Sequence, residues 1–119
     1  MDIVNVLKAL SDESRIRILN ILNKRDVCVC EMQEILGLTQ TNISKHLSKL
    51  KDLKLVVSEK QGQYVFCSIN KQALRKYPFI RAILDSETSK DKTLKKDAKI
   101  FEKMNSKGMV CERDKCCRK

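Results

Sequence analysis

Cysteines are the residues of this 119-residue sequence whose types and spacing best suit chemistry. Cys28 and Cys30 are separated by one residue, and Cys111, Cys116 and Cys117 cluster near the end of the chain. Thiolates bind soft ions, and with a single histidine in the chain these five cysteines are the candidate ligands of a thiophilic ion. Neither cluster contains the C-x-x-C pairs of a zinc ribbon, which disfavours structural zinc.

The remaining cysteine and the histidine have simpler interpretations. Cys67 shares an alternating face with Val65 and Ile69, so we expect it to replace a small apolar residue in the core. His46 has no ligating neighbour on its own helical face. We therefore expect a half-packed or phosphate-contacting histidine rather than a metal ligand.

Two consecutive helices are predicted next to the first cysteine pair. Apolar residues recur with helical periodicity over residues 27–36, and Gly37 follows where a left-handed residue ends a helix. After a turn over residues 37–39, a second helix is predicted over residues 40–53, with Ile43, Leu47, Leu50 and Leu53 on one face. This arrangement is a helix-turn-helix, whose second helix enters the major groove of DNA.

The polar face of that second helix carries the candidate DNA contacts. Short hydrogen-bonding side chains and a lysine near its N-terminus can reach base edges. A histidine and a lysine further along the helix can reach the DNA backbone. A hairpin follows, with strands over residues 55–57 and 63–69, a turn at Gln61 and Gly62, and a tip that could touch phosphate or the minor groove. The predicted DNA-binding residues are Gln40, Thr41, Asn42, Ser44, Lys45, His46, Lys49, Lys60 and Gln63.

The flanking segments predict further helices. Helices are expected over residues 4–10 and 15–23, with Ser11 capping the second. Pro78 suits the first turn of another helix, and Thr88 with Asp91 forms a possible capping box for a last one. We predict a mainly α fold with a β-hairpin, made of a DNA-binding domain over residues 1–105 and a cysteine-containing tail over residues 106–119.

Composition narrows the class of protein. A formal charge of +10 favours polyanionic partners, and residues 24–76 hold ten basic against five acidic residues. Aromatic residues make up 4% of the chain, which argues against a β-sandwich. The chain is too short for a multi-domain enzyme, and no apolar run reaches the 18 or so residues of a membrane span. We expect a cytoplasmic protein without a membrane partner.

Three segments resemble one family: LSDESRIRIL at residues 10–19, VCVCEM at 27–32 and LGLTQTNISKHL at 36–47. They resemble the ArsR/SmtB family of winged-helix metalloregulatory repressors, over roughly residues 3–85. The resemblance implies a homodimer that binds inverted-repeat operator DNA of a resistance operon and leaves it when a toxic ion binds. The Cys-Val-Cys segment is similar to that of arsenite- and antimonite-responsive members and also to that of cadmium/lead sensors. The first similarity implies As(III) or Sb(III) as the inducer and no organic cofactor.

Two departures from that family bear on the ligands. Many arsenic-responsive members have a third thiol where this chain has Gln33, so the pair is one ligand short. Other relatives use C-terminal cysteines, which Cys111, Cys116 and Cys117 resemble. Side chains at positions i and i+2 of a helix lie about 200° apart, so Cys28 and Cys30 could not share an ion while both are helical. We therefore expect ion binding to unwind the first turn of their helix.

Two other functions remain open. The thiols could form a redox switch in a repressor of the same fold, released by oxidant rather than by an ion. The chain could also be a small thiol-dependent arsenate-reducing enzyme, although no glycine-rich, phosphate-cradling loop surrounds any cysteine. We expect a non-enzyme.

Overall fold

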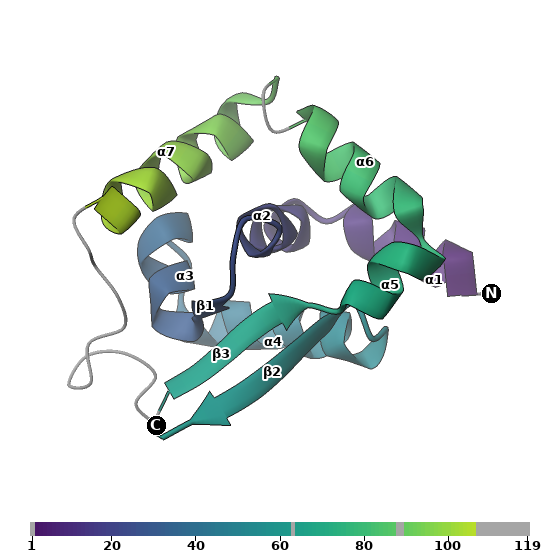
Figure 1. Cartoon of the computed structure of the whole chain (residues 1–119), viewed down its shortest axis with the longest axis horizontal. Helices are drawn as coiled ribbons and strands as arrows, with labels where there is room; N and C mark the ends of the chain where they lie inside the picture. Colours follow the sequence, from purple (N-terminus) through teal and green to yellow (C-terminus); the bar gives the residue numbers. More distant parts are fainter. Residues whose placement is uncertain (1, 63, 88–89, 107–119) are drawn as a thin grey trace.

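The computed structural model describes residues 2–62, 64–87 and 90–106. This part of the chain is mainly α-helical, with one small antiparallel sheet (Figure 1). Its elements in chain order are α1 (Asp2–Leu10), α2 (Glu13–Leu22), β1 (Val27–Cys28), α3 (Val29–Leu36), α4 (Gln40–Asp52), β2 (Val56–Gln61), β3 (Tyr64–Ile69), α5 (Lys71–Lys76), α6 (Pro78–Glu87) and α7 (Lys92–Ser106).

Helix α2 is the centre of the fold. It packs against α1, α3, α4, α7 and β3 and buries most of its second half (Figure 1). The predicted cap was wrong by one residue: the Asp12 side chain accepts a hydrogen bond from the Arg15 backbone N at 3.1 Å and caps α2. Ser11 instead donates its hydroxyl to the Lys8 carbonyl at 2.7 Å, at the end of α1.

Strand β1 replaces the expected start of a helix. Val27 and Cys28 pair with Cys67 and Phe66 of β3, which gives the strand order β1-β3-β2. Cys28 is extended, with φ −90° and ψ 164°, so α3 begins at Val29 rather than at residue 27. Periodicity could not show this, because two residues are too few for a strand signal and their pairing partners lie some forty positions away.

The helix-turn-helix prediction is confirmed. Gly37 ends α3 in the left-handed region, with φ 68°. Thr39 caps α4 by accepting a hydrogen bond from the Asn42 backbone N at 3.2 Å. Of the predicted apolar face, Ile43, Leu47 and Leu50 are buried and pack on the core. Leu53, predicted as the last helical residue, is the C-cap of α4 and is half-buried.

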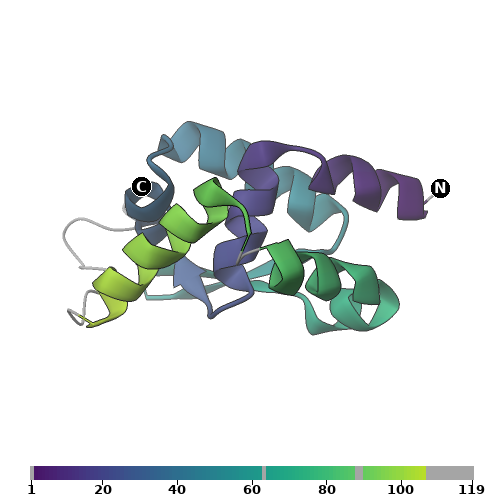
Figure 2. The same ribbon diagram turned by 90° about the horizontal axis from the view of Figure 1, so that it is seen from above.

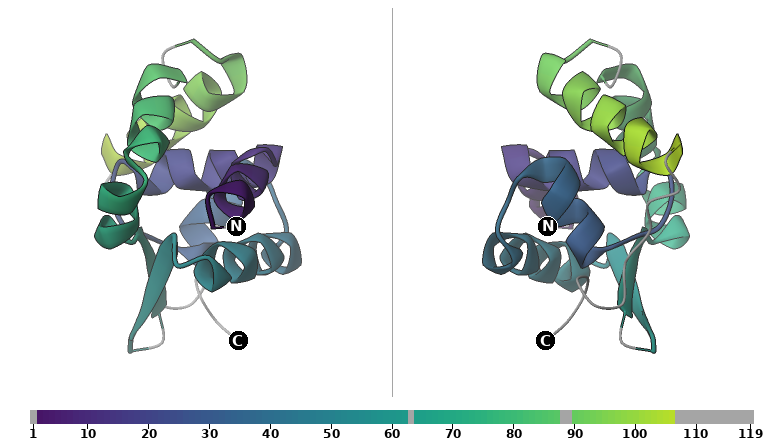
Figure 3. Two further views of the ribbon diagram at one scale, coloured as in Figure 1. Left: turned by 90° about the vertical axis from the view of Figure 1, so that its right-hand side faces the viewer. Right: turned by 90° about the vertical axis from the view of Figure 1, so that its left-hand side faces the viewer.

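The hairpin is also present, with strands β2 and β3 joined at Gly62, whose φ is 65°. Figure 3 shows it projecting on the same side of the molecule as α4, while α6 and α7 lie at the opposite end. Cys67 is fully buried in the core, as expected.

The C-terminal helices add one unexpected element. Helix α5 was not predicted, while α6 begins at Pro78 as expected. Asp91 caps α7, because its carboxylate accepts hydrogen bonds from the Thr93 and Leu94 backbone N atoms. The prediction had placed Asp91 inside the first turn, in a capping box with Thr88, which lies outside the described residues. Figure 2 shows α7 crossing the body and α1 at one end of the molecule. Within the described ranges, no helix is long and apolar enough to cross a membrane.

Candidate nucleic-acid interface and thiol pair

Helix α4 presents a continuous polar face. The buried side of the helix faces α2 and α3, so the remaining side chains point outward. All but one of the predicted contact residues on this helix are exposed, namely Gln40, Thr41, Asn42, Ser44, Lys45 and Lys49. Lys60 is exposed on β2, and Gln63 lies outside the described residues. A rigid helix with these donors and acceptors can read base edges, while the lysines can contact phosphates.

His46 differs from the other predicted contacts. Its side chain is half-buried, and its Nδ1 lies 3.9 Å from the Asp12 carboxylate at the start of α2. Partial burial opposes ionisation of Asp12, but the backbone hydrogen bond from Arg15 and the charges of Arg15 and His46 outweigh it and lower the pKa of Asp12. His46 is therefore half-packed, as expected, and lies beside the cap of α2.

A groove of about 240 Å³ separates α4 from the hairpin. Apolar side chains from three elements lie along it, and polar side chains of α4 form part of its lining. Its lining residues are Val29, Gln40, Ser44, Leu47, Ser48, Lys51, Val65 and Cys67. Ser48 and Lys51, which are not among the predicted DNA contacts, belong to the polar part of this lining.

The two neighbouring cysteines are brought together at the junction of β1 and α3. The Cys28 and Cys30 Sγ atoms lie 3.3 Å apart, and both side chains are buried. This corrects the expectation that the pair sits on opposite sides of a helix. Cys28 is extended and only Cys30 is helical, so the 200° separation does not apply and the sulfurs meet without any unwinding.

Charged and aromatic groups surround this pair. The Glu31 carboxylate accepts a hydrogen bond from the Cys28 backbone N at 3.1 Å and forms an ion pair with Arg25 at 2.9 Å. Tyr64 and Phe66 of β3 pack against the two cysteines. Cys111, Cys116 and Cys117 lie outside the described residues, within which no group of three or more His, Cys, Asp or Glu side chains could hold a metal ion.

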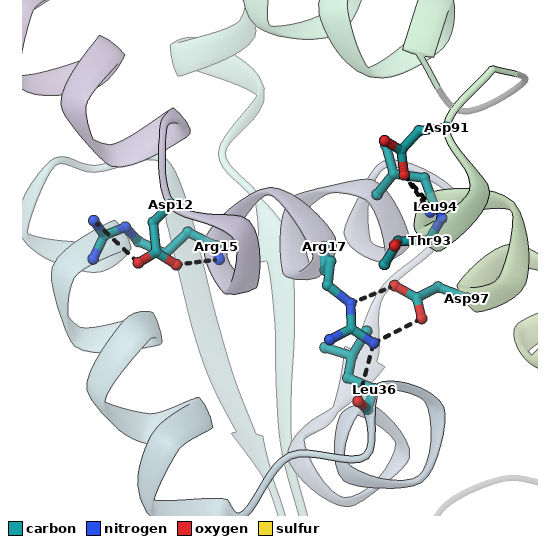
Figure 4. Close-up of polar contacts among 8 residues, drawn as sticks. All are labelled: Asp12, Arg15, Arg17, Leu36, Asp91, Thr93, Leu94 and Asp97. Carbon is teal, nitrogen blue, oxygen red and sulfur yellow. Dashed lines mark hydrogen bonds and ion pairs between the residues drawn. The ribbon is translucent and has the colours of Figure 1, made fainter.

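A second charged contact anchors α7 beside the helix-turn-helix (Figure 4). The Arg17 guanidinium donates to both carboxylate oxygens of Asp97, at 2.9 and 3.0 Å, and to the Leu36 carbonyl at 3.0 Å. The hydrogen bonds to Asp97 raise the pKa of Arg17 further, against partial burial. One side chain thus joins α2, α7 and the C-terminal end of α3, just before the turn at Gly37.

Sequence reasoning missed this anchor, although a signal was present. Asp97 falls on the apolar side of α7, which also carries Leu94, Phe101 and Met104, and it is 1% exposed. A carboxylate within a buried stripe requires a partner, since an unpaired buried charge is costly. Arg25 adds a further contact to this helix, because its guanidinium lies 4.9 Å from the centroid of the Phe101 ring.

A helix-turn-helix followed by a two-stranded wing, with an exposed polar face on its second helix, defines a winged helix-turn-helix DNA-binding protein. Comparison with known proteins gives the same fold. One similar structure is the homodimeric winged helix-turn-helix DNA-binding domain of Mb0332 from Mycobacterium bovis, described as a possible ArsR-family transcriptional regulator. It superposes on this chain with a TM-score of 0.61 at 23% identity, and the match covers 76% of this chain and 85% of that one.

Sequence relatives identify the family. Residues 12–58 match the model of the bacterial regulatory proteins of the arsR family. The arsenical resistance operon repressor of Staphylococcus xylosus is 33% identical over 61% of this chain and 70% of its own length. The cadmium resistance transcriptional regulatory protein CadC homolog of Staphylococcus aureus is 33% identical over 63% of each chain, so this chain spans less than two thirds of that relative. The protein belongs to the arsR family of bacterial regulatory proteins.

Proposed function

We propose that this protein represses an arsenic resistance operon by binding its operator DNA, and that As(III) or Sb(III) releases it by binding cysteine thiolates. The observation that carries the proposal is the presence, on one small fold, of an exposed reading face on α4 and a pair of sulfurs 3.3 Å apart at the start of α3. A relative named as an arsenical resistance operon repressor supports the metalloid assignment.

The DNA part of the proposal rests on the exposed polar face. Gln40, Thr41, Asn42, Ser44 and Lys45 contact bases in the major groove, and Lys49 and Lys60 contact phosphates on either side. We assign His46 a supporting position near the DNA backbone, because its side chain is half-buried and lies beside Asp12.

The thiol part rests on the separation of the two sulfurs. Two bonds of about 2.3 Å, the length of a zinc–thiolate bond, to sulfurs 3.3 Å apart enclose an angle of about 90°. With both residues in the reduced thiolate form, Cys28 and Cys30 would therefore hold one ion with little change in the separation of their sulfurs. A third thiolate would come from Cys111, Cys116 or Cys117, which stays a prediction.

Dimerisation is the remaining part of the proposal. Helix α1 exposes the apolar side chains of Ile3, Val4 and Leu7, which are 40%, 39% and 48% exposed. A second copy of the chain would bury this surface, in keeping with the homodimeric Mb0332 domain. A two-fold symmetric dimer would bind half-sites of an inverted repeat about 34 Å apart.

The proposal is tested with DNA that the protein itself selects from a random-sequence duplex pool. Selected duplexes should contain an inverted repeat, and arsenite or antimonite should weaken binding about tenfold to a hundredfold. Cys28→Ser and Cys30→Ser should each abolish that weakening. Complexes that ignore arsenite, antimonite and cadmium alike would overturn the metalloid assignment and leave DNA binding in place.

A cadmium or lead sensor is the second candidate, favoured by the similarity to the cadmium regulatory protein. The same binding experiment separates the two, because release by cadmium at concentrations where arsenite has no effect would favour this alternative. Release by an oxidant in the absence of any added ion would instead identify a redox switch.

A further inference from the structure

We infer that the groove between α4 and the hairpin holds one strand of the DNA backbone, and that Ser48 and Lys51 on its α4 wall contact the phosphates of this strand. The inference rests on the proposed function, because it requires α4 in the major groove of a duplex. It adds a binding surface and two contact residues beyond those predicted from the sequence.

The shape of duplex DNA requires a space between the two DNA-binding elements. Helix α4 would fill the major groove, and the hairpin, which projects on the same side of the molecule, would reach the neighbouring minor groove (Figure 3). In a duplex, one sugar–phosphate strand separates a major groove from the minor groove beside it. That strand must therefore pass between α4 and the hairpin, where the structure has a groove of about 240 Å³.

Polar side chains of α4 form one wall of this groove. The polar residues that line it are spaced three or four positions apart along the helix, so they project from one side of it. They are Gln40, Ser44, Ser48 and Lys51, and all four are exposed. Because an α-helix rises 1.5 Å per residue, this wall is about 16 Å long and can face several successive phosphates of one strand.

The charge of the groove suits an anion. Among the described residues that line it, Lys51 alone is charged and none is acidic. Asp52, the acidic residue of α4, instead lines hollows beside α1. Lysine ammonium groups and serine hydroxyl groups are donors that bind phosphate oxygens. The wall therefore offers a phosphate donors and one positive charge, without a carboxylate to repel it.

The rest of the groove is apolar. Val65 of β3 lines its hairpin side, and Leu47 and Cys67, which are both buried, line its depth. A DNA strand has the same two-sided character, because its phosphate oxygens are charged while its deoxyribose rings present C–H groups. With the phosphates toward α4 and the sugars toward β3, no charged oxygen is placed against the apolar side.

Lys49 and Lys51 lie on opposite flanks of α4. Two residues correspond to about 200° around a helix, and Lys49 is exposed but does not line the groove. A helix in the major groove has one DNA strand on each side. Lys51 therefore contacts the strand between α4 and the hairpin, whereas Lys49 contacts the other strand. This difference separates the new contact from the predicted one.

The first measurement is the salt dependence of DNA binding by the full-length protein, with a duplex selected from the random-sequence pool as the probe. Lys51→Gln should lower the slope of log Kd against log salt concentration by about one. Lys99→Gln removes an exposed lysine of α7, at the opposite end of the molecule, and should leave the slope unchanged (Figure 3). Equal slopes for these two variants would overturn the inference.

The second measurement locates the contacted phosphate. The probes are duplexes in which one phosphate at a time is replaced by an uncharged methylphosphonate. Replacement of the phosphate that Lys51 contacts should weaken binding of the parent and of Lys49→Gln about threefold to tenfold, and binding of Lys51→Gln less than about twofold. The phosphate to which Lys49→Gln becomes insensitive should lie on the other strand. Insensitive positions on the same strand for both variants would overturn the placement of a strand in the groove.

Ser48→Ala tests the uncharged part of the wall. Loss of one hydrogen bond to a phosphate should weaken binding about twofold to tenfold, and the salt slope should stay that of the parent, because a hydroxyl group carries no charge. Ser48→Thr keeps the hydroxyl group and should bind like the parent. Affinity of Ser48→Ala equal to that of the parent would overturn the role of Ser48. A parent protein that selects no duplex would instead overturn the proposed function.

Discussion

The reading face of α4 and the thiol pair at the start of α3 lie close together in the chain but are built in opposite ways. Helix α4 presents exposed polar side chains on a scaffold of neighbouring apolar residues, Ile43, Leu47 and Leu50, all within the same helix. The pair formed by Cys28 and Cys30 is buried, and its surroundings come from separate segments. Glu31, paired with Arg25, accepts a hydrogen bond from the Cys28 backbone N, and the β3 aromatics pack against both cysteines.

This difference separates two kinds of requirement. A DNA-reading face must be accessible and rigid, which one amphipathic helix achieves. A sensing site for a soft ion must exclude water and still respond when the ion arrives, which requires contacts from elements that can move relative to one another. The following predictions break or sharpen this contrast.

The support of α4 should be the most sensitive feature. Leu50→Ala removes a fully buried side chain from beneath the helix, and we expect a loss of about 3 to 5 kcal/mol in the free energy of unfolding. Denaturant unfolding followed by circular dichroism measures it. Ser48→Ala, at an exposed position of the same helix, is the control and should change stability by less than about 0.5 kcal/mol. Similar losses for both variants would contradict a buried support.

The anchor of α7 should come next. Asp97→Asn leaves the Arg17 guanidinium without its carboxylate in a nearly buried position, and we expect a loss of about 2 to 3 kcal/mol. The matched control is Asp2→Asn, in an exposed pair with Lys76 at 3.6 Å, which should cost less than about 0.5 kcal/mol. Denaturant unfolding of both variants measures the loss in the free energy of unfolding. A loss for Asp97→Asn no larger than that of the control would show that Arg17 does not anchor α7.

Two substitutions distinguish base reading from phosphate binding. Gln40→Ala should reduce discrimination between selected and scrambled duplexes by about 1 to 2 kcal/mol. Lys60→Gln should weaken binding to both duplexes equally and lower the salt slope by about one. Fluorescence anisotropy over a salt series measures both effects. The assignment of α4 to bases and the wing to the backbone fails if the two variants behave alike.

The cap beside the thiol pair should have a smaller, local effect. Glu31→Gln keeps an oxygen that can accept the Cys28 N–H but loses the ion pair with Arg25, so we expect a loss of about 1 kcal/mol. Amide hydrogen exchange should become faster in the first turn of α3 and remain unchanged in α4. Faster exchange throughout α4 would show that the two regions are not separate.

The cap of α2 should produce the smallest effect, visible as a pH dependence. The pKa of Asp12 lies below its ordinary value of 3.8 in the folded protein, so its contribution is present above about pH 4 and is lost as the pH falls through the folded value. The carboxylate is 35% exposed, and screening keeps this contribution below about 1 kcal/mol. Unfolding of the parent and of Asp12→Asn between pH 2.5 and 6, roughly, should give curves that converge at low pH. Parallel curves would exclude Asp12 as the titrating group.

Most of the helix-turn-helix could be predicted because its signals are local. The periodicity of Ile43, Leu47 and Leu50, and the left-handed Gly37, depend on residues within a few positions of each other. The same holds for Pro78 at the start of α6. Helix α5 was missed because six residues are too few to show a period, and its cap at Asn70 is a single side chain.

The amino-acid sequence by itself determined the class of fold, the polar face of α4 and the positions of the cysteines. Only the tertiary structure decided how the thiols meet and what surrounds them. Cys28 is extended because β3 pairs with β1, and Asp97 can be buried because Arg17, eighty residues away in the chain, pairs with it. Helical periodicity depends on residues that are close in the chain and can be recognised from the sequence. Strand pairing and buried ion pairs join residues that are far apart in the chain, so the sequence alone does not show that they are close in space.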